Sequence, residues 1–275
     1  MKPRSAQLAI ASLVVACGLH AVDAKALNPN TKDANAIAKA VDAQDGGDKT
    51  TSLMTMTLKD ASGRKRVRKL QQRSLKFHGG TKTIIFFESP ADVRNTALLS
   101  VDYDDGNKTD DQWLYLPSLH KSTRISSSEK SGSFLGTDLT YADMTKPDIS
   151  DYNYKIVKQS AKVGGEDCWV LESRAKTKKL AEETGYLKSH QWISKSKLIP
   201  LQVKSWITEG KKLKYMKFGD VKKVDGVWTP FKLSVRTMRA GKVESMTTLV
   251  FNRIRHNQDS VTDSDFTERR LEKGL

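Results

Sequence analysis

The chain has 275 residues, a formal net charge of +15 and a hydrophobic fraction of 37%. This length excludes a disulfide-stapled mini-protein and suits one large β-rich domain or two ordinary domains. Its two cysteines exclude a disulfide framework and a multi-cysteine zinc site. Five tryptophans, eight phenylalanines and seven tyrosines argue against a disordered chain. The basic charge favours an acidic partner, such as nucleic acid, anionic lipid or an acidic protein surface.

Residues 1–24 have the pattern of a secretory signal peptide. Lys2 and Arg4 supply a short cationic region, and Leu8–Leu19 is an apolar stretch too short to span a bilayer. The segment ends in Val-Asp-Ala, which places small residues at the two positions that a signal peptidase reads. We therefore expect a signal peptide over 1–24, a single domain over 25–275 and export to a bacterial periplasm.

A second processing route depends on Cys17. The sequence Val-Val-Ala-Cys that ends at Cys17 fits a relaxed lipobox, in which the cysteine is lipidated and becomes the first mature residue. Such boxes usually carry leucine where the first valine stands, and an ordinary cleavage site follows. The sequence leaves both products open, a soluble periplasmic protein and a lipoprotein anchored to a membrane through Cys17. No later segment approaches 18 apolar residues, so we expect no transmembrane helix.

The chain after the signal segment begins with one helix and then changes to an alternating pattern. Residues 33–45 predict a helix, because Asp33 can cap its start and two glycines follow its end. From Met54 to Lys59 apolar and polar residues alternate, which indicates a half-buried strand. Further strands are predicted over 64–77, 81–88, 97–103, 113–117 and 122–126.

The second half of the chain is again rich in strand patterns. These strands are predicted over 154–160, 168–173, 189–194, 201–207, 213–218, 228–237 and 243–254. Glycine-containing turns about every 10–15 residues are typical of an all-β sheet of long, twisted strands. We therefore expect a mostly β fold built on one large, curved antiparallel sheet. Curling hides the edges of such a sheet and leaves one apolar inner face.

Residues 127–150 form the longest stretch without strand character. The segment is rich in serine, glycine, threonine and aspartate, yet it carries several apolar residues that need a place to pack. Long ordered loops of this kind often cover functional sites, and the alternative is a passive loop that fills one end of a barrel. The candidate lid residues are Phe134, Leu135, Leu139, Tyr141 and Met144.

The sequence contains no motif of a known catalytic or metal site. The histidines that follow the signal segment are His78, His120, His190 and His256, and their spacing matches no metal-binding motif. Walker, GxGxxG and GxSxG motifs are absent as well. Cys168 lies on a predicted strand, where a buried structural thiol is the better interpretation. We expect a protein that is not an enzyme and that needs no metal or cofactor.

Two charged segments resemble binding motifs but are better explained as solvated surface. Residues 102–111 hold five aspartates and one glycine. Placing Gly106 at the sixth position of an EF-hand loop puts Val101 first and Tyr103 third, so a solvated hairpin turn fits better. The basic run Arg64–Lys69 resembles a nucleic-acid patch. In an exported chain we expect it to be the solvated face of a β-ribbon instead.

The segment DDQWLYLPSLHKSTRISSSEKSGSFLGTDLTYADM, at 110–144, resembles the signature of the outer-membrane lipoprotein-sorting protein family, a LolA-like group of periplasmic proteins. Shorter pieces agree in order at 54–68, 90–93, 182–186 and 213–230 and at the C-terminal DFTERRLEKGL. The resemblance covers roughly residues 34–275. It implies an incomplete β-barrel, in which helices or loops close a bent antiparallel sheet around an apolar cavity for acyl chains.

The resemblance also implies a function. A carrier of this kind shields lipid or lipoprotein acyl chains on the way to the outer membrane, since each exposed CH₂ costs about 0.8 kcal/mol in water. The candidate lining residues are Met54, Met56, Leu58, Phe86, Leu99, Val101, Leu114, Leu201, Val203, Phe231 and Leu233. We expect a monomer that binds an acyl chain and no nucleic acid, with an inner-membrane lipid exporter as a second candidate partner. The alternative function is a periplasmic interaction or sensor module that partners a membrane lipid exporter and transports no cargo.

Overall fold

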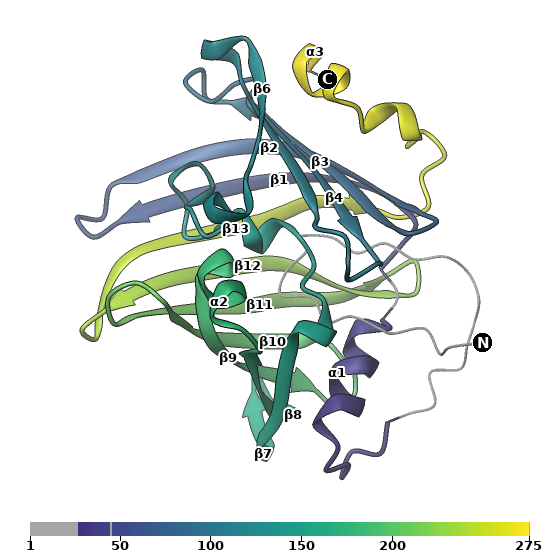
Figure 1. Cartoon of the computed structure of the whole chain (residues 1–275), viewed down its shortest axis with the longest axis vertical. Coiled ribbons are helices and arrows are strands. Elements are labelled where there is room, and N and C mark those ends of the chain that lie inside the picture. The colour runs from purple at the N-terminus through teal and green to yellow at the C-terminus, as the bar shows by residue number, and fades with distance from the viewer. Residues whose placement is uncertain (1–26, 45, 275) are drawn as a thin grey trace.

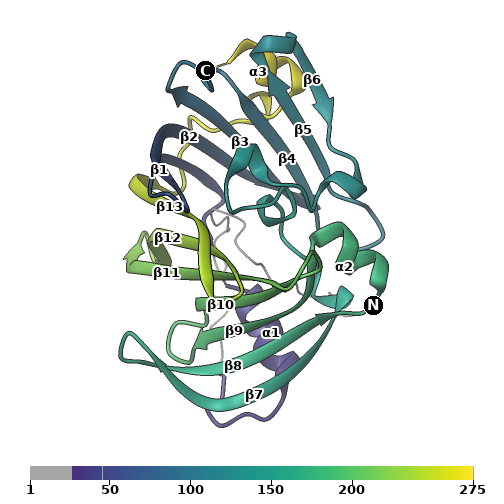
Figure 2. The same cartoon turned by 90° about the vertical axis from the view of Figure 1, so that its left-hand side faces the viewer.

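The computed structural model describes residues 27–44 and 46–274, so the predicted signal peptide and Cys17 lie outside the described residues. The described strands form one antiparallel sheet of 13 strands, in the order β6-β5-β4-β3-β2-β1-β13-β12-β11-β10-β9-β8-β7. Figures 1 and 2 show this sheet curving from β6 at one edge to β7 at the other without closing. The predicted large, curved antiparallel sheet is confirmed.

Each predicted run contains a strand, although the strand predicted from Met54 already begins at Lys49 and the one predicted over 213–218 continues to Val224. In the first half the strands are β1 (Lys49–Asp60), β2 (Lys65–Phe77), β3 (Gly80–Ser89), β4 (Ala97–Tyr103), β5 (Asp111–Leu116) and β6 (Lys121–Arg124). In the second half they are β7 (Tyr152–Val163), β8 (Glu166–Ala175), β9 (Tyr186–Ser194), β10 (Pro200–Ile207), β11 (Lys212–Val224), β12 (Val227–Arg239) and β13 (Lys242–Arg255). Between β6 and β7 the chain makes only short 3₁₀ turns, as the irregular composition of 127–150 predicts.

Within residues 27–44 and 46–274, three short α-helices accompany the sheet: α1 (Ala34–Asp42), α2 (Lys178–Thr184) and α3 (Glu268–Lys273). The predicted N-terminal helix is confirmed as α1, and the Asp33 carboxylate caps it by accepting hydrogen bonds from the backbone N–H groups of Asn35 and Ala36. Ile37 and Val41 of α1 pack with Trp169 and other side chains of β8 and β9. The helix therefore closes the β7–β9 end of the sheet (Figure 1).

The sheet has two faces that the strand register defines. We call inner the face on which Met54, Met56 and Leu58 of β1 lie, and outer the face of their exposed or half-exposed neighbours in sequence. The pairing of β10 with β9 and β11 places Val203 beside Gln191 and Met216 on the same inner face. Helix α1 packs on this inner face too. Its buried side chains cluster with Leu171 of β8, and Leu171 pairs with Gln191, which lies on the inner face.

The C-terminal segment covers the outer face of β3–β5. Val261, Phe266 and Leu271 pack there against a cluster that includes Ile84 and Leu99. Both faces of β3 and β4 are consequently buried, which explains why the IIFF run of β3 is apolar on either side. Two ion pairs fasten this segment, Arg73 to Asp265 at 2.7 Å and Lys82 to Asp263 at 2.5 Å.

Truncating Leu271 to alanine should therefore destabilise the whole sheet. Leu271 is fully buried, and a buried Leu→Ala change costs about 2–5 kcal/mol through lost contacts and the cavity left behind. The matched control is Leu119→Ala, since Leu119 is 63% exposed and its truncation should change stability by less than about 0.5 kcal/mol. Urea unfolding of both variants tests this, and equal midpoints would contradict the packing of the C-terminal segment.

Candidate functional site

A continuous apolar surface, which we call the apolar band, runs across the middle of the inner face. Met54 and Met56 of β1 lie at its centre and are each 1% exposed. Its other members come from neighbouring strands: Leu58, Leu70, Ile85, Phe87, Leu98, Leu114, Val203, Met216, Leu233, Val235, Leu249, Phe251 and Ile254. The flexible methionines allow such a surface to adapt to partners of different shape.

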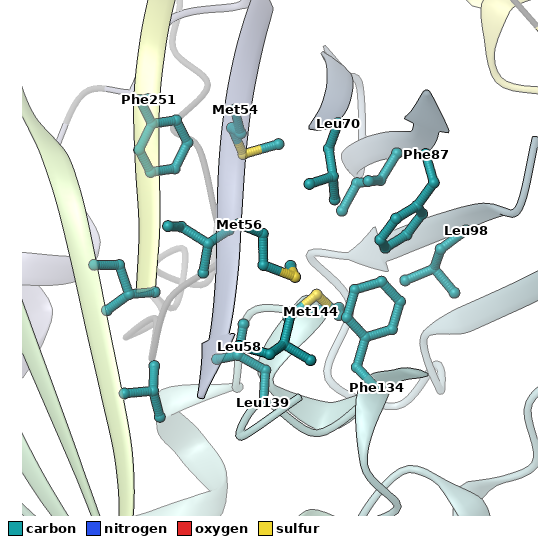
Figure 3. Close-up of a cluster of buried hydrophobic side chains, with 14 of the residues drawn as sticks. Met54, Met56, Leu58, Leu70, Phe87, Leu98, Phe134, Leu139, Met144 and Phe251 are labelled. Carbon is teal, nitrogen blue, oxygen red and sulfur yellow. The ribbon is translucent and has the colours of Figure 1, made fainter. Parts of the chain in front are cut away.

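A loop over residues 134–144, which we call the covering loop, lies on the apolar band. Phe134 and Leu139 are each 1% exposed and Met144 is 5% exposed, and all three belong to the same cluster as the band. Figure 3 shows Phe134 beside Phe87, and their ring centroids are 5.8 Å apart. The candidate lid segment therefore packs directly on the predicted inner face.

Asp138, in the middle of the covering loop, is anchored to β12 and β13. Its carboxylate accepts hydrogen bonds from the hydroxyls of Thr237 (2.6 Å), Ser245 (2.5 Å) and Thr247 (2.7 Å). Its backbone N–H donates to the Thr247 hydroxyl at 2.9 Å. Hydrogen bonds to a charged acceptor are about twice as strong as neutral ones, so this single side chain holds the loop firmly.

Asp143 makes a second anchor at the end of the covering loop. The Tyr186 hydroxyl donates to its carboxylate at 2.8 Å, and the Lys214 ammonium lies 3.1 Å from Oδ2 and also contacts the Tyr186 hydroxyl. The side chains of Lys214 and Asp143 are only 4% and 1% exposed. Burial, with the Asp143 carboxylate next, raises the pKa of Tyr186 well above its usual value. The phenol therefore stays protonated and donates to Asp143.

Two further contacts hold the covering loop from the β2 and β5 side. Arg68 donates from Nη1 to the backbone carbonyl of Leu135 at 2.9 Å, and its guanidinium lies 5.7 Å from the centre of the Phe87 ring. Gln112 donates from Nε2 to the carbonyl of Tyr141 at 3.0 Å. Arg68 is 5% exposed. The prediction that the side chains of Arg64–Lys69 are solvated is therefore wrong for Arg68.

Five residues of the family-like signature at 110–144 help to hold the covering loop. Gln112, Asp138 and Asp143 of the signature make the polar contacts described above, and Phe134 supplies a buried ring. The Tyr141 ring lies 5.7 Å from that of Phe134. Each position thus has a local physical role in attaching the loop to the sheet.

The predicted lining residues are divided between the two faces. Met54, Met56, Leu58, Leu114, Val203 and Leu233 belong to the apolar band, and Phe231 packs against it. Phe86 and Leu99 lie instead on the outer face under the C-terminal segment, and Val101 lines a shallow pocket there with Phe266. The expectation that one surface contains all eleven is therefore corrected. Leu201 is buried but belongs to none of the three large clusters.

Of the predicted lid residues, Phe134, Leu139 and Met144 are buried on the band, whereas Leu135 and Tyr141 are partly buried against it. The sequence reasoning missed the polar side chains that hold the loop, namely Arg68, Tyr186 and Lys214. It also missed Leu70, Phe87 and Met216 of the band, although alternation with Met54 and Met56 on paired strands was a signal that pointed to them.

Rows of polar side chains flank the apolar band. Across the first five strands the register aligns buried Thr50, Ser74, Thr83, Ser100 and Gln112. Across β8–β13 it aligns Ser173, Ser189, Ser205, Lys214, Thr237 and Ser245. Ser189 and Ser205 share a hydrogen bond of 2.7 Å. The inner face is thus apolar in the middle and hydrogen-bonding on both sides.

Buried carboxyls gather where the covering loop leads toward β7. Lys146 pairs with Asp42 at 2.8 Å through its ammonium and donates its backbone N–H to Asp102 at 2.7 Å. Burial raises the pKa of Asp42 to about 6 and the pKa of Asp102 well above its usual value. A neighbouring pocket of about 190 Å³ contains Asp110 and Lys130. This volume is below that of ordinary ligand pockets.

The buried Cys168 thiol is poorly suited to act as a nucleophile. Burial raises the pKa of the Cys168 thiol to about 11, so the reactive thiolate is scarce at neutral pH. Among residues 27–44 and 46–274, no three histidine, cysteine or acidic side chains lie together in a way that suits a metal ion. Within the same residues, no helix has the length and apolar character needed to cross a membrane.

Removing the ammonium of Lys214 should loosen the covering loop. Lys214→Ala leaves the Asp143 carboxylate buried without its cation, which costs about 3–5 kcal/mol. Lys179→Ala is the control, since Lys179 is 83% exposed in its pair with Glu183 and such pairs contribute about 0–1 kcal/mol. Hydrogen exchange should accelerate over residues 134–144 in the first variant only. Unchanged exchange there would contradict the proposed anchoring role.

The raised pKa of Asp42 predicts a pH dependence of stability. The folded chain keeps the Asp42 proton up to about pH 6, whereas the carboxyl has a pKa of 3.8 without its surroundings. Unfolding therefore releases this proton between about pH 4 and 6, and the free energy of unfolding falls as pH rises through that window. Asp42→Asn removes this titrating group. Between about pH 4 and 6, the free energy of unfolding of this variant should therefore fall less steeply with pH than that of wild type, by up to about 1 kcal/mol per pH unit. Identical slopes in urea unfolding would contradict it, and Glu209→Gln serves as an exposed control.

Solved structures share this architecture. The domain from Vibrio parahaemolyticus, described as a candidate outer membrane lipoprotein-sorting protein domain, is 31% identical, with a TM-score of 0.77 over 86% of this chain and 97% of that chain. A DUF1329 family protein from Desulfovibrio piger is 28% identical, with a TM-score of 0.78 over 88% and 100%. A LolA superfamily protein from Nitrosomonas europaea shares the fold at 19% identity, with a TM-score of 0.64 over 86% and 98%.

Two other comparisons complete the assignment. The model of a protein family described only as "Uncharacterized protein" matches residues 79–273. No curated protein matches the chain significantly. The match to the Vibrio domain covers nearly all of that domain. The chain therefore belongs to the outer-membrane lipoprotein-sorting protein family and has its LolA-like fold, an incomplete β-barrel, as the sequence of residues 110–144 indicated.

Proposed function

We propose that this protein is a periplasmic carrier that shields an acyl chain of a lipid or lipoprotein on the apolar band and delivers it to the outer membrane. One observation carries the proposal. The band is covered by an irregular loop, and the Phe134, Leu139 and Met144 side chains of that loop occupy the place that an acyl chain would take. The flanking polar rows would then contact the ester or head group.

The energies of loop and cargo are of similar size. An acyl chain of about 16 carbons gains roughly 12 kcal/mol when its CH₂ groups leave water. Displacing Phe134, Leu139 and Met144 exposes three side chains at about 1.5–3 kcal/mol each, and breaking the buried Asp143–Lys214 pair costs about 3–5 kcal/mol more. Exchange between loop and cargo is then nearly balanced, which suits a carrier that must both load and release.

Other parts of the proposal concern export and partners. We propose that residues 1–24 direct export and are removed, that residues 25–275 act as one monomeric unit without catalysis, and that an inner-membrane lipid exporter supplies the cargo. The description of the Vibrio domain as a lipoprotein-sorting protein domain supports the proposed transport role. Intact-mass measurement of protein from the periplasm decides whether Cys17 has been removed or lipidated.

One observation favours the alternative, an interaction or sensor module without cargo. The covering loop already fills the band, with Phe134 and Leu139 almost completely buried. In that case the loop is a permanent part of the core, and a protein partner binds elsewhere on the sheet.

Weakening the Asp138 anchor distinguishes the two functions. If cargo displaces the covering loop, Asp138→Ala should bind a fluorescent fatty acid at least fivefold more tightly than wild type, because less energy opposes loop release. Asp92→Ala, at an exposed position outside the loop, is the control and should bind like wild type. Native mass spectrometry of wild type from the periplasm should also detect bound lipid.

The carrier function is wrong if the purified protein is lipid-free and if neither wild type nor Asp138→Ala binds the probe while circular dichroism shows both folded. A stable protein partner that co-purifies with lipid-free protein would then favour the interaction module.

A further inference from the structure

The outer face of β1, β2 and β10–β13 is basic. At the ladder positions that face outward on these six strands, the charged residues are all cations. Eight of them are Lys59, Lys65, Lys69, Lys204, Lys217, Lys232, Arg236 and Arg253. One row illustrates the order, since Lys65, Lys59, Met246, Arg236, Tyr215 and Lys204 pair in register across the six strands. We call this surface the outer basic face.

These eight cations have no carboxylate partner within the part of the chain that the structure describes. Some other surface cations are paired with carboxylates, as Lys188 is with Glu172 at 2.8 Å and Arg239 is with Glu244 at 2.8 Å. Uncompensated charges of one sign on one face create a field that attracts a partner of opposite charge. The partner must therefore present a broad anionic surface.

Apolar groups are interleaved with the cations. Val67, Val243 and Val250 lie on the outer face and are 51%, 44% and 40% exposed. The Trp206 ring has two lysine ammonium groups, those of Lys188 and Lys204, each 4.6 Å from its centre. Tryptophan, lysine and exposed aliphatic side chains together are typical of surfaces that settle at the head-group level of a membrane.

We propose that the outer basic face docks on an anionic lipid surface. The phosphates of the lipid bind the unpaired cations, while the exposed valines and the edge of Trp206 contact the head-group boundary. An acidic protein would match the charge but would not need the exposed valines of β2 and β13 among the cations. The inference extends the proposed carrier function by giving the side of the sheet that meets the membrane, and it leaves the inner face free.

Vesicle sedimentation tests the docking separately from cargo binding. The Cys17→Ser chain, purified from the periplasm, excludes a lipid anchor at that residue. It should bind vesicles containing about one-third phosphatidylglycerol and not vesicles of phosphatidylcholine alone. The variant Lys65→Glu/Lys204→Glu/Arg236→Glu should lose at least tenfold in partitioning, because three attractive charges become repulsive. Raising the salt concentration should weaken wild-type binding.

The matched control is Lys121→Glu/Lys162→Glu/Lys178→Glu, which changes the net charge equally at exposed positions off this face. It should bind nearly like wild type. Equal losses in the two triple variants would overturn the proposal, since net charge alone would then explain binding. So would failure of the folded wild type to bind anionic vesicles, and retention by an acidic protein in that case would point to a protein partner. Neither result changes the binding of the fluorescent fatty acid, so the docking proposal and the carrier proposal can be refuted separately.

Discussion

The buried contact among Asp143, Lys214 and Tyr186 is the constraint on which the inner face depends. A carboxylate and an ammonium out of water are unfavourable apart, and their mutual contact is what makes their burial tolerable. Because Asp143 belongs to the covering loop and Lys214 to β11, the loop must lie across the sheet for either charge to be satisfied. That position in turn brings Phe134, Leu139 and Met144 onto the apolar band.

The two faces use charge in opposite ways. Inside, Asp138 and Asp143 are saturated by hydroxyls and by one lysine, so charge serves to attach a loop. On the outer basic face, eight lysines and arginines have no carboxylate partner among the described residues, so their charge acts on the surroundings. Alternation along each strand makes this division possible, since successive side chains point to opposite faces.

Sequence patterns predicted α1 and nearly every strand, because capping by Asp33 and period-two alternation are local signals. They did not predict that Leu98 and Leu99 lie on opposite faces. Strands β3–β5 are apolar on both sides, so they show no alternation of apolar and polar residues that would identify the inner face. The outer position of Leu99 depends on a C-terminal segment more than 150 residues away. The polar contacts of the covering loop could not be predicted either, because Asp138 and Thr247, which share a hydrogen bond, are 109 residues apart in the sequence.

A sheet that curls without closing keeps two free edges, and edge strands invite pairing with other chains. Here both edges are poor templates. β6 has only four residues. β7 is long, yet its pairing with β8 shifts register twice, and Lys155, Lys158 and Lys162 are exposed along it. An incoming strand would meet an irregular backbone and repelling charge, so the barrel can stay open without becoming a site of aggregation.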